Sequence, residues 1–254
     1  ELLATVRNML ALKSREREVE ALNQRLVEQG LARVLPPALL EAVLSGEKEF
    51  HQKPEERSVT VLSARLGGFD HQLRNLPSAS SGALLDDYLG VTSRMAFAHG
   101  GTMVHFSADR IDVLFGAPEE MAPEDALSAA VLCALDMRTA VEEMSDAWRR
   151  KGEILPDLCV GVHAGEALVG TFGSEHRAEY TAIGPAVSLA EKLAQVAQPG
   201  SVTLSSEVAD RLPSGCWRKA GKLVLQGEAE PLILAQLTDG TSAILQREAA
   251  QRSA

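Results

Sequence analysis

One stretch of the chain, residues 100–118, constrains the fold more than any other because it predicts a β-hairpin. Residues 103–106 and 111–115 are short runs of strand-forming side chains, and the polar segment 107–109 separates them. A glycine and a proline close the second run, as is common where a strand ends. An acid at a hairpin tip often bonds its own backbone, so Asp109 taken alone is interpreted as a turn residue.

Residues 57–66 form a second run typical of a strand, rich in β-branched side chains. The glycine turn after it leads toward a helix. The other expected elements are two helical pieces within 70–99, a helix over 126–151, a strand–turn–strand unit over 158–170, a strand entering a helix over 180–193, a strand at 201–205, and a final strand pair at 221–225 and 231–237.

Residues 1–30 are predicted to form one charge-rich helix. Its apolar residues at heptad spacing are Leu12, Val19, Leu22 and Leu26. This spacing favours a parallel coiled coil that carries a signal from an upstream domain, and a helix packed on its own domain is the alternative. Basic and acidic residues balance within residues 1–53, so the net charge of −10 falls on the remainder and indicates a boundary there.

The overall charge and the cysteine count exclude several classes of protein. A net charge of −10 argues against a non-specific nucleic-acid binder, and no apolar run approaches the ~20 residues needed to cross a membrane. Cys133, Cys159 and Cys216 are too widely spaced for a disulfide framework or a zinc site, which indicates a reducing, cytoplasmic location. The chain begins at Glu1 inside the expected helix, so we expect an upstream sensor or receiver domain in the whole protein.

Four motifs accompany the hairpin in a specific order and spacing. They lie at residues 115–118, 161–166, 170–174 and 180–184. With the hairpin, they make residues 57–237 resemble the catalytic domains of class III adenylate and guanylate cyclases. The resemblance implies an α+β, ferredoxin-like nucleotide-cyclase fold, with a mixed, mainly antiparallel sheet packed by helices and preceded by a coiled-coil helix. It also implies a signalling helix and linker at 1–53, a cyclase homology domain at 54–238 and a C-terminal tail at 239–254.

Such enzymes cyclise a nucleoside triphosphate: the ribose 3′-hydroxyl attacks the α-phosphorus and pyrophosphate leaves. Two divalent ions, Mg²⁺ or Mn²⁺, held between two carboxylates support this step. By the resemblance, Asp109 retains one metal carboxylate, whereas Arg65 stands where the family has the other. A guanidinium about 4 Å from a divalent ion is repelled by about 8 kcal/mol at an effective dielectric constant near 20.

We therefore hypothesise that Arg65 pairs with Asp109 and occupies the metal position. The alternative is an alignment wrong by one residue, with Arg65 facing solvent. Asp112 is not expected to replace the missing carboxylate, because three residues along a strand place it on the opposite face from Asp109.

Other positions that the resemblance assigns to the active site are also altered. Ser188 and Lys192 stand where the family has the Asn and Arg that stabilise the transition state, and Lys lacks the planar fork of Arg. His105 and Thr181 stand at the base-reading pair, where Thr181 suits adenine and His105 replaces a Lys. The phosphate-binding turn corresponds to Gly67, Gly68 and Phe69.

His163 and Glu166 invite an interpretation as metal ligands or acid–base groups. Their expected place in a turn between two strands favours a structural role, since such short motifs carry little information.

Three hypotheses follow. The first is a degenerate cyclase domain that acts as a dimeric signalling module, with or without bound ATP or a related nucleotide and with no metal cofactor. The second is a slow or heterodimeric adenylate cyclase that uses Mg²⁺ or Mn²⁺. The third is a dimerisation spacer that binds no nucleotide. In each case the partner is expected to be a second cyclase domain, joined through the coiled coil and the cyclase domain itself.

Overall fold

The computed structural model of the protein describes residues 37–46, 53–69, 78–153, 155–174, 177–225 and 230–252, and Lys13, Arg15 and Leu22 as single residues. Contacts divide the chain into two units, Glu1–Glu49 and Phe50–Ala254, and each is described by itself. In the first unit, α2 spans Pro37–Leu44. Lys13, Arg15 and Leu22 are helical. The other hydrophobic positions of the predicted coiled coil, Leu12, Val19 and Leu26, lie outside the described residues.

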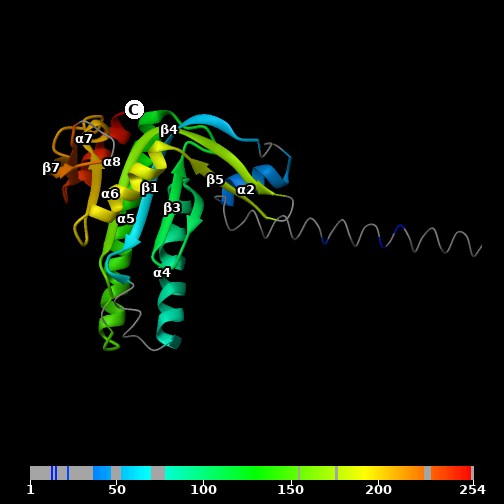
Figure 1. Ribbon diagram of the computed structural model, residues 1–254, viewed down its shortest axis with the longest axis horizontal. Coiled ribbons are helices and arrows are strands. Elements are labelled where there is room, and N and C mark those ends of the chain that lie inside the picture. Colours follow the sequence, from blue (N-terminus) through cyan, green and yellow to red (C-terminus); the bar gives the residue numbers. More distant parts are fainter. Residues whose placement is uncertain are drawn as a thin grey trace, which may run out of the picture. The chain divides into compact units, whose positions relative to one another are not determined.

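The second unit is built on β1, Glu55–Leu66, which belongs to an eight-stranded sheet (Figure 1). It lies between β3, Arg110–Phe115, and β4, Leu158–Ser174, and is antiparallel to both. The strand order is β2-β3-β1-β4-β6-β8-β7, with β5 paired to β4. The remaining strands are β2 (Thr102–Phe106), β5 (Arg177–Ile183), β6 (Val202–Ser205), β7 (Trp217–Leu223) and β8 (Leu232–Leu237). Strands β4 and β6 are parallel and the other described pairs are antiparallel, which confirms the predicted mixed, mainly antiparallel sheet.

Helices cover both faces of this sheet. On one face, α4 (Ser78–Ala98) and α5 (Pro123–Arg149) pack against each other and form a core with Leu62 of β1. On the other face, α6 (Pro185–Val196) packs on Val61. Both β1 residues are fully buried. Because both faces of β1 are covered, the strand is buried continuously from Val59 to Ala64, including the polar residues Thr60 and Ser63.

Several predicted elements are confirmed. The hairpin is present as β2 and β3, with Asp109 in the turn between them. The predicted long helix is α5, which begins at Pro123 because proline fits the first turn of a helix. The helix α4 begins at Ser78, within the stretch predicted to separate two helical pieces, and residues 70–77 lie outside the described residues.

The prediction of a strand, a turn and a second strand over residues 158–170 is wrong, because β4 runs through the whole segment. Its glycines allow α6 to approach the sheet rather than turning the chain. A Cβ at Gly161 would overlap the backbone carbonyl O of Ala190 and the amide N of Ala194, and one at Gly165 would lie 3.4 Å from the Cβ of Ala186. Glycine inside a strand commonly marks such a close approach.

His163 therefore lies within β4 and not in a turn. Its Nδ1 is 2.9 Å from the Oγ of Ser205 in β6, so the imidazole joins the two parallel strands. Burial lowers the pKa of His163 below its ordinary value of 6.5, with Glu207 opposing and Arg211 reinforcing the shift. Glu166 is exposed. The contact with Ser205 supports the structural interpretation of His163.

The last strand pair differs in its bounds from the predicted pair. Strand β7 begins at Trp217, before the predicted start at residue 221, and ends at Leu223. It is an edge strand with several exposed polar residues. Its sequence therefore lacks the alternation of apolar and polar residues that predicts a strand. Its hydrogen bonds to β8 define it instead.

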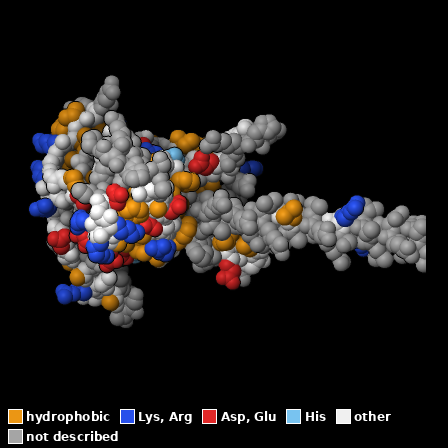
Figure 2. Space-filling model, turned by 90° about the horizontal axis from the view of Figure 1, so that it is seen from below, with side chains coloured by type: hydrophobic (Ala, Val, Ile, Leu, Met, Phe, Trp, Pro, Cys, Tyr) orange, Lys and Arg blue, Asp and Glu red, His pale blue; other side chains and the backbone are white. Residues whose placement is uncertain are grey.

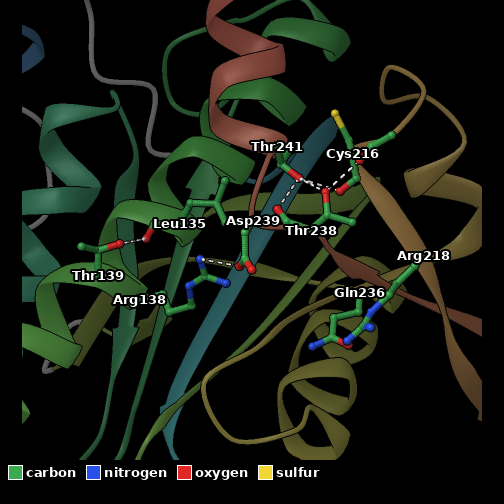
Figure 3. A network of polar contacts seen from close by, with 10 residues as sticks. Leu135, Arg138, Thr139, Cys216, Arg218, Gln236, Thr238, Asp239 and Thr241 are labelled. Atoms are coloured by element: carbon green, nitrogen blue, oxygen red, sulfur yellow. Dashed lines mark hydrogen bonds and ion pairs between the residues drawn. The ribbon is translucent and has the colours of Figure 1, made fainter.

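The predicted C-terminal tail, residues 239–254, folds over most of its length as α8, Thr241–Arg252, which packs on α5. Leu245 is only 5% exposed and belongs to the core. Figure 3 shows the contacts at the start of this helix. The Oγ1 of Thr241 lies 2.6 Å from the carbonyl O of Cys216, and Arg138 of α5 forms an ion pair with Asp239 at 3.5 Å (Figure 3).

On the face drawn in Figure 2, acidic and basic side chains are interspersed, with hydrophobic side chains between them. Among the described residues of the second unit, the exposed large hydrophobic ones are Phe106, Leu168, Ile183, Val196 and Val224. Leu168 and Ile183 are direct partners in the pairing of β4 with β5. Within the described part of the chain, no helix is both long and apolar enough to span a membrane.

We expect Gly161→Ala to lower the free energy of unfolding by about 3 kcal/mol, because the new methyl group would displace α6 from β4. The measurement is urea denaturation followed by circular dichroism. Gly82→Ala is the control: nothing lies within 4 Å of a Cβ there, and the residue is inside α4. The control should raise stability by about 0.5–1 kcal/mol. Equal effects of the two substitutions would contradict the close approach of α6.

We expect wild-type stability to fall relative to His163→Gln as the pH drops below about 6.5. Unfolded His163 takes up a proton near its ordinary pKa of 6.5, whereas the folded protein holds that pKa lower, so protonation in this interval favours unfolding. Urea denaturation at pH 7.5 and pH 5.5 measures the effect, and titrations common to both proteins cancel in the difference. A difference in unfolding free energy that is the same at both pH values would contradict a lowered pKa.

Candidate functional site

A cavity of about 430 Å³ lies where the end of β1 and the hairpin tip meet α6. We call it the β1–α6 pocket. Its lining residues are Arg65, Ser107, Asp109, Arg110, Ser188, Glu191, Lys192 and Gln195. Four of them, Arg65, Asp109, Ser188 and Lys192, were singled out from the sequence. The fold thus brings together residues from three separate segments of the chain.

The predicted contact between Arg65 and Asp109 is present. Nη2 of Arg65 donates to Oδ2 of Asp109 at 2.8 Å, and the two side chains are 30% and 23% exposed. The backbone brings the two residues together, because the amide N of Leu66 donates to the carbonyl O of Asp109 at 2.8 Å. Arg65 therefore lines the pocket and contacts Asp109 there.

Asp112 lies inside β3 and is 2% exposed. Its Oδ1 accepts a hydrogen bond from the Oγ of Ser63 at 2.7 Å, and its Oδ2 lies 3.2 Å from Nη2 of Arg110. Burial raises the pKa of Asp112 above its ordinary value, and Ser63 and Arg110 oppose that rise. The strand-parity argument against Asp112 does not apply, because Asp109 lies in the turn. Both carboxylate oxygens of Asp112 are nevertheless already engaged, one with Ser63 and the other with Arg110.

Arg110 and Glu191 were not found from the sequence. Nη1 of Arg110 lies 3.2 Å from Oε2 of Glu191, so this arginine joins β3 to α6 as well as contacting Asp112. Nothing local in the sequence pairs residues so far apart, and the contact depends on where α6 crosses the sheet. The Nε atoms of Arg65 and Arg110 are both buried without a hydrogen-bond partner.

Helix α6 presents Ser188 and Lys192 to the pocket because these residues lie one turn apart. Its opposite side carries the buried residues Ala186, Ala190, Leu193 and Ala194. Lys192 is exposed and forms no ion pair within the part of the chain that the structure describes. The pocket therefore holds three cationic groups, and two of them are matched by carboxylates.

The remaining predicted site residues do not line this pocket. His105 lies on the edge strand β2 and Thr181 on β5, and both are half-buried. In the predicted phosphate turn, the amide N of Gly67 donates to the carbonyl O of Asp157 at 3.0 Å, and Phe69 is 1% exposed in the core. The Gly67 amide is thus already engaged within the fold.

These residues do not fit a site for two divalent ions. Such a site needs at least two carboxylates facing one position, and here Asp109 faces the guanidinium of Arg65 instead. Among the described residues, no group of three or more His, Cys, Asp and Glu side chains is placed to hold a metal ion.

Comparisons with known proteins agree with this architecture. The family model described as the adenylate and guanylate cyclase catalytic domain matches residues 51–233. The crystal structure of the adenylyl cyclase CyaB from P. aeruginosa is similar with a TM-score of 0.70 and 28% identity, covering 74% of this chain and 96% of that chain. The crystal structure of the guanylyl cyclase Cya2 has a TM-score of 0.67 and 26% identity, covering 74% and 94%.

Among curated relatives, Adenylate cyclase 1 of Rhizobium meliloti (strain 1021) is 34% identical over 113 residues, which is 44% of this chain and 16% of that protein. An uncharacterised protein of Mycobacterium tuberculosis (strain ATCC 25618 / H37Rv) is 28% identical over 188 residues, 72% of this chain and 33% of that protein. The chain thus spans a third or less of the length of these two relatives.

The family match covers most of the second unit, and the solved cyclases share its fold. The mixed, mainly antiparallel sheet packed by helices agrees with the architecture expected from the sequence. The chain belongs to the family of class III adenylate and guanylate cyclase catalytic domains.

Proposed function

We propose that this chain is a degenerate cyclase domain that acts as a dimeric signalling module and binds a nucleotide such as ATP without cyclising it efficiently. The observation that carries the proposal is the 2.8 Å contact between Arg65 Nη2 and Asp109 Oδ2. In an active member of the family, these two positions would be a pair of carboxylates that hold divalent ions. Here the guanidinium takes the place of the cation.

Two electrostatic effects disfavour the binding of a divalent ion beside Arg65 and Asp109. The guanidinium repels a divalent ion about 4 Å away by about 8 kcal/mol at an effective dielectric constant near 20. Replacing a carboxylate with Arg65 also removes one source of attraction. At the transition-state positions, Ser188 offers a single short donor and Lys192 offers a point charge without a planar fork. These changes all disfavour efficient cyclisation.

Charge supports a role for the pocket in binding phosphate. Arg65, Arg110 and Lys192 line it together, and Lys192 forms no ion pair among the described residues. Phosphate oxygens are strong acceptors for guanidinium and ammonium groups. A nucleotide could therefore bind there without a divalent ion.

The alternative is an active adenylate cyclase that is slow or works as a heterodimer with Mg²⁺ or Mn²⁺. Retention of Asp109 and of the adenine-compatible Thr181 favours it, as do the names of the related cyclases. A partner chain could supply the missing Asn and Arg. It could not remove Arg65 from the metal position.

We propose that the module pairs with a second copy through residues 1–53 and the cyclase domain, 54–238, and responds to an upstream sensor or receiver domain in the cytoplasm. Leu168 and Ile183 support such a contact, because they are neighbours on β4 and β5 and are 42% and 53% exposed. They line a cavity of about 570 Å³ beside the start of α6. An apolar pair exposed at a cavity is typical of an interaction surface.

We expect the purified protein to form no cyclic nucleotide above a blank without enzyme when it is given ATP or GTP with Mg²⁺ or Mn²⁺. Calorimetry on the same samples should detect nucleotide binding. Cyclic product that is lost in Asp109→Ala would establish the active enzyme instead. Neither product nor binding would support a dimerisation spacer and overturn the nucleotide-binding part of the proposal.

We expect Arg65→Asp to make ATP binding depend on divalent ions, with affinity at least about tenfold higher with Mn²⁺ than with a chelator, since repulsion at the metal position is removed. Calorimetry measures both affinities. Arg218→Asp makes the same charge change on the exposed strand β7 and should show no such dependence. If Arg65→Asp alters neither metal nor nucleotide affinity, the assignment of residue 65 to the metal position is wrong.

A further inference from the structure

We propose that Arg110 is a phosphate-binding residue of the β1–α6 pocket and that Glu191 competes with the phosphate for it. The inference rests on the proposed function, in which this pocket binds nucleotide without a metal ion. It adds a residue that the sequence did not indicate and a carboxylate that limits access to it.

The contacts of Arg110 leave room for a better acceptor. Its distances to Asp112 and Glu191 are both 3.2 Å, longer than the 2.8 Å between Arg65 and Asp109. Charge-assisted bonds from a guanidinium to an anion are typically about 2.7–2.9 Å long. The Nε of Arg110 is also buried without a hydrogen-bond partner. A phosphate group can accept two N–H bonds from one edge of the planar guanidinium group, whereas Asp112 contacts Nη2 and Glu191 contacts Nη1.

The two carboxylates differ in how easily they can release Arg110. The side chain of Asp112 is 2% exposed and is held by Ser63, so it would be costly to leave unpaired. The side chain of Glu191 is 35% exposed on α6 and can turn to water at little cost. Asp112 thus anchors the arginine, and Glu191 is the exchangeable partner.

The position of Lys192 favours the same ligand chemistry. It follows Glu191 on α6, lines the same pocket and forms no ion pair among the described residues. A phosphate between α6 and β3 would therefore meet the cationic groups of both Lys192 and Arg110. The carboxylate of Glu191, which also lines the pocket, is the anion that it would displace.

The test uses the whole chain in a buffer with a chelator, with ATP and inorganic pyrophosphate as the two ligands in calorimetry. We expect Glu191→Gln to tighten binding of both ligands about two- to fivefold, the range for relieving a partly exposed ion pair. Glu124→Gln is the matched control. Glu124 on α5 forms a 3.3 Å ion pair with Arg211, and neither residue lines the pocket. It should leave both affinities unchanged.

A double-mutant cycle separates competition for Arg110 from a general loss of negative charge. Arg110→Lys keeps the positive charge but removes the planar fork, so in this background Glu191→Gln should change affinity by less than about 1.5-fold. If Glu191→Gln tightened ligand binding equally in the wild type and in Arg110→Lys, the effect would come from the loss of one negative charge and not from competition for Arg110. That result would overturn the inference. Unchanged affinity in Glu191→Gln, with binding by the wild type intact, would also overturn it and leave the proposed function standing.

If the wild type binds neither ligand, the variants distinguish two cases. Binding by Glu191→Gln alone would support the inference, with Glu191 blocking the pocket completely. No binding by any of the variants would overturn both the inference and the nucleotide-binding part of the proposed function.

Discussion

The close contact between α6 and β4 is the constraint on which the pocket depends. It exists because Gly161 has no side chain where the backbone of α6 passes, at Ala190 and Ala194. Protein interiors are packed too tightly for a methyl group to be added there without moving the helix. Gly161, together with Gly165, thus permits α6 to lie this close to the sheet, where Ser188 and Lys192 meet the end of β1.

Two of the three cationic groups in the pocket are paired with carboxylates. Arg65 offsets Asp109, and Arg110 offsets Asp112 and Glu191. A site built from carboxylates alone needs bound cations to relieve their repulsion, whereas guanidinium groups supply the positive charge here. Membership of the cyclase family therefore accounts for the backbone, and the identities of a few side chains decide what the pocket can bind.

Short sequence patterns were sufficient to predict those helices and strands that neighbouring residues specify. The hairpin at Asp109 follows from turn residues between two apolar runs, and α5 follows from an apolar stripe with a proline at its start. The prediction failed where distant packing decided the outcome. Glycines in β4 looked like a turn but accommodate α6, and the edge strand β7 is defined by its pairing with β8.

The sequence by itself determined the family and the order of most elements, and it led to the prediction that Arg65 stands in place of a metal carboxylate. It also suggested the contact with Asp109, because opposite charges at matched family positions are expected to pair. The contact between Arg110 and Glu191 was decided only by the tertiary structure. It joins residues far apart in the chain, and their separation depends on how closely α6 packs on the sheet, which no local pattern of residues specifies.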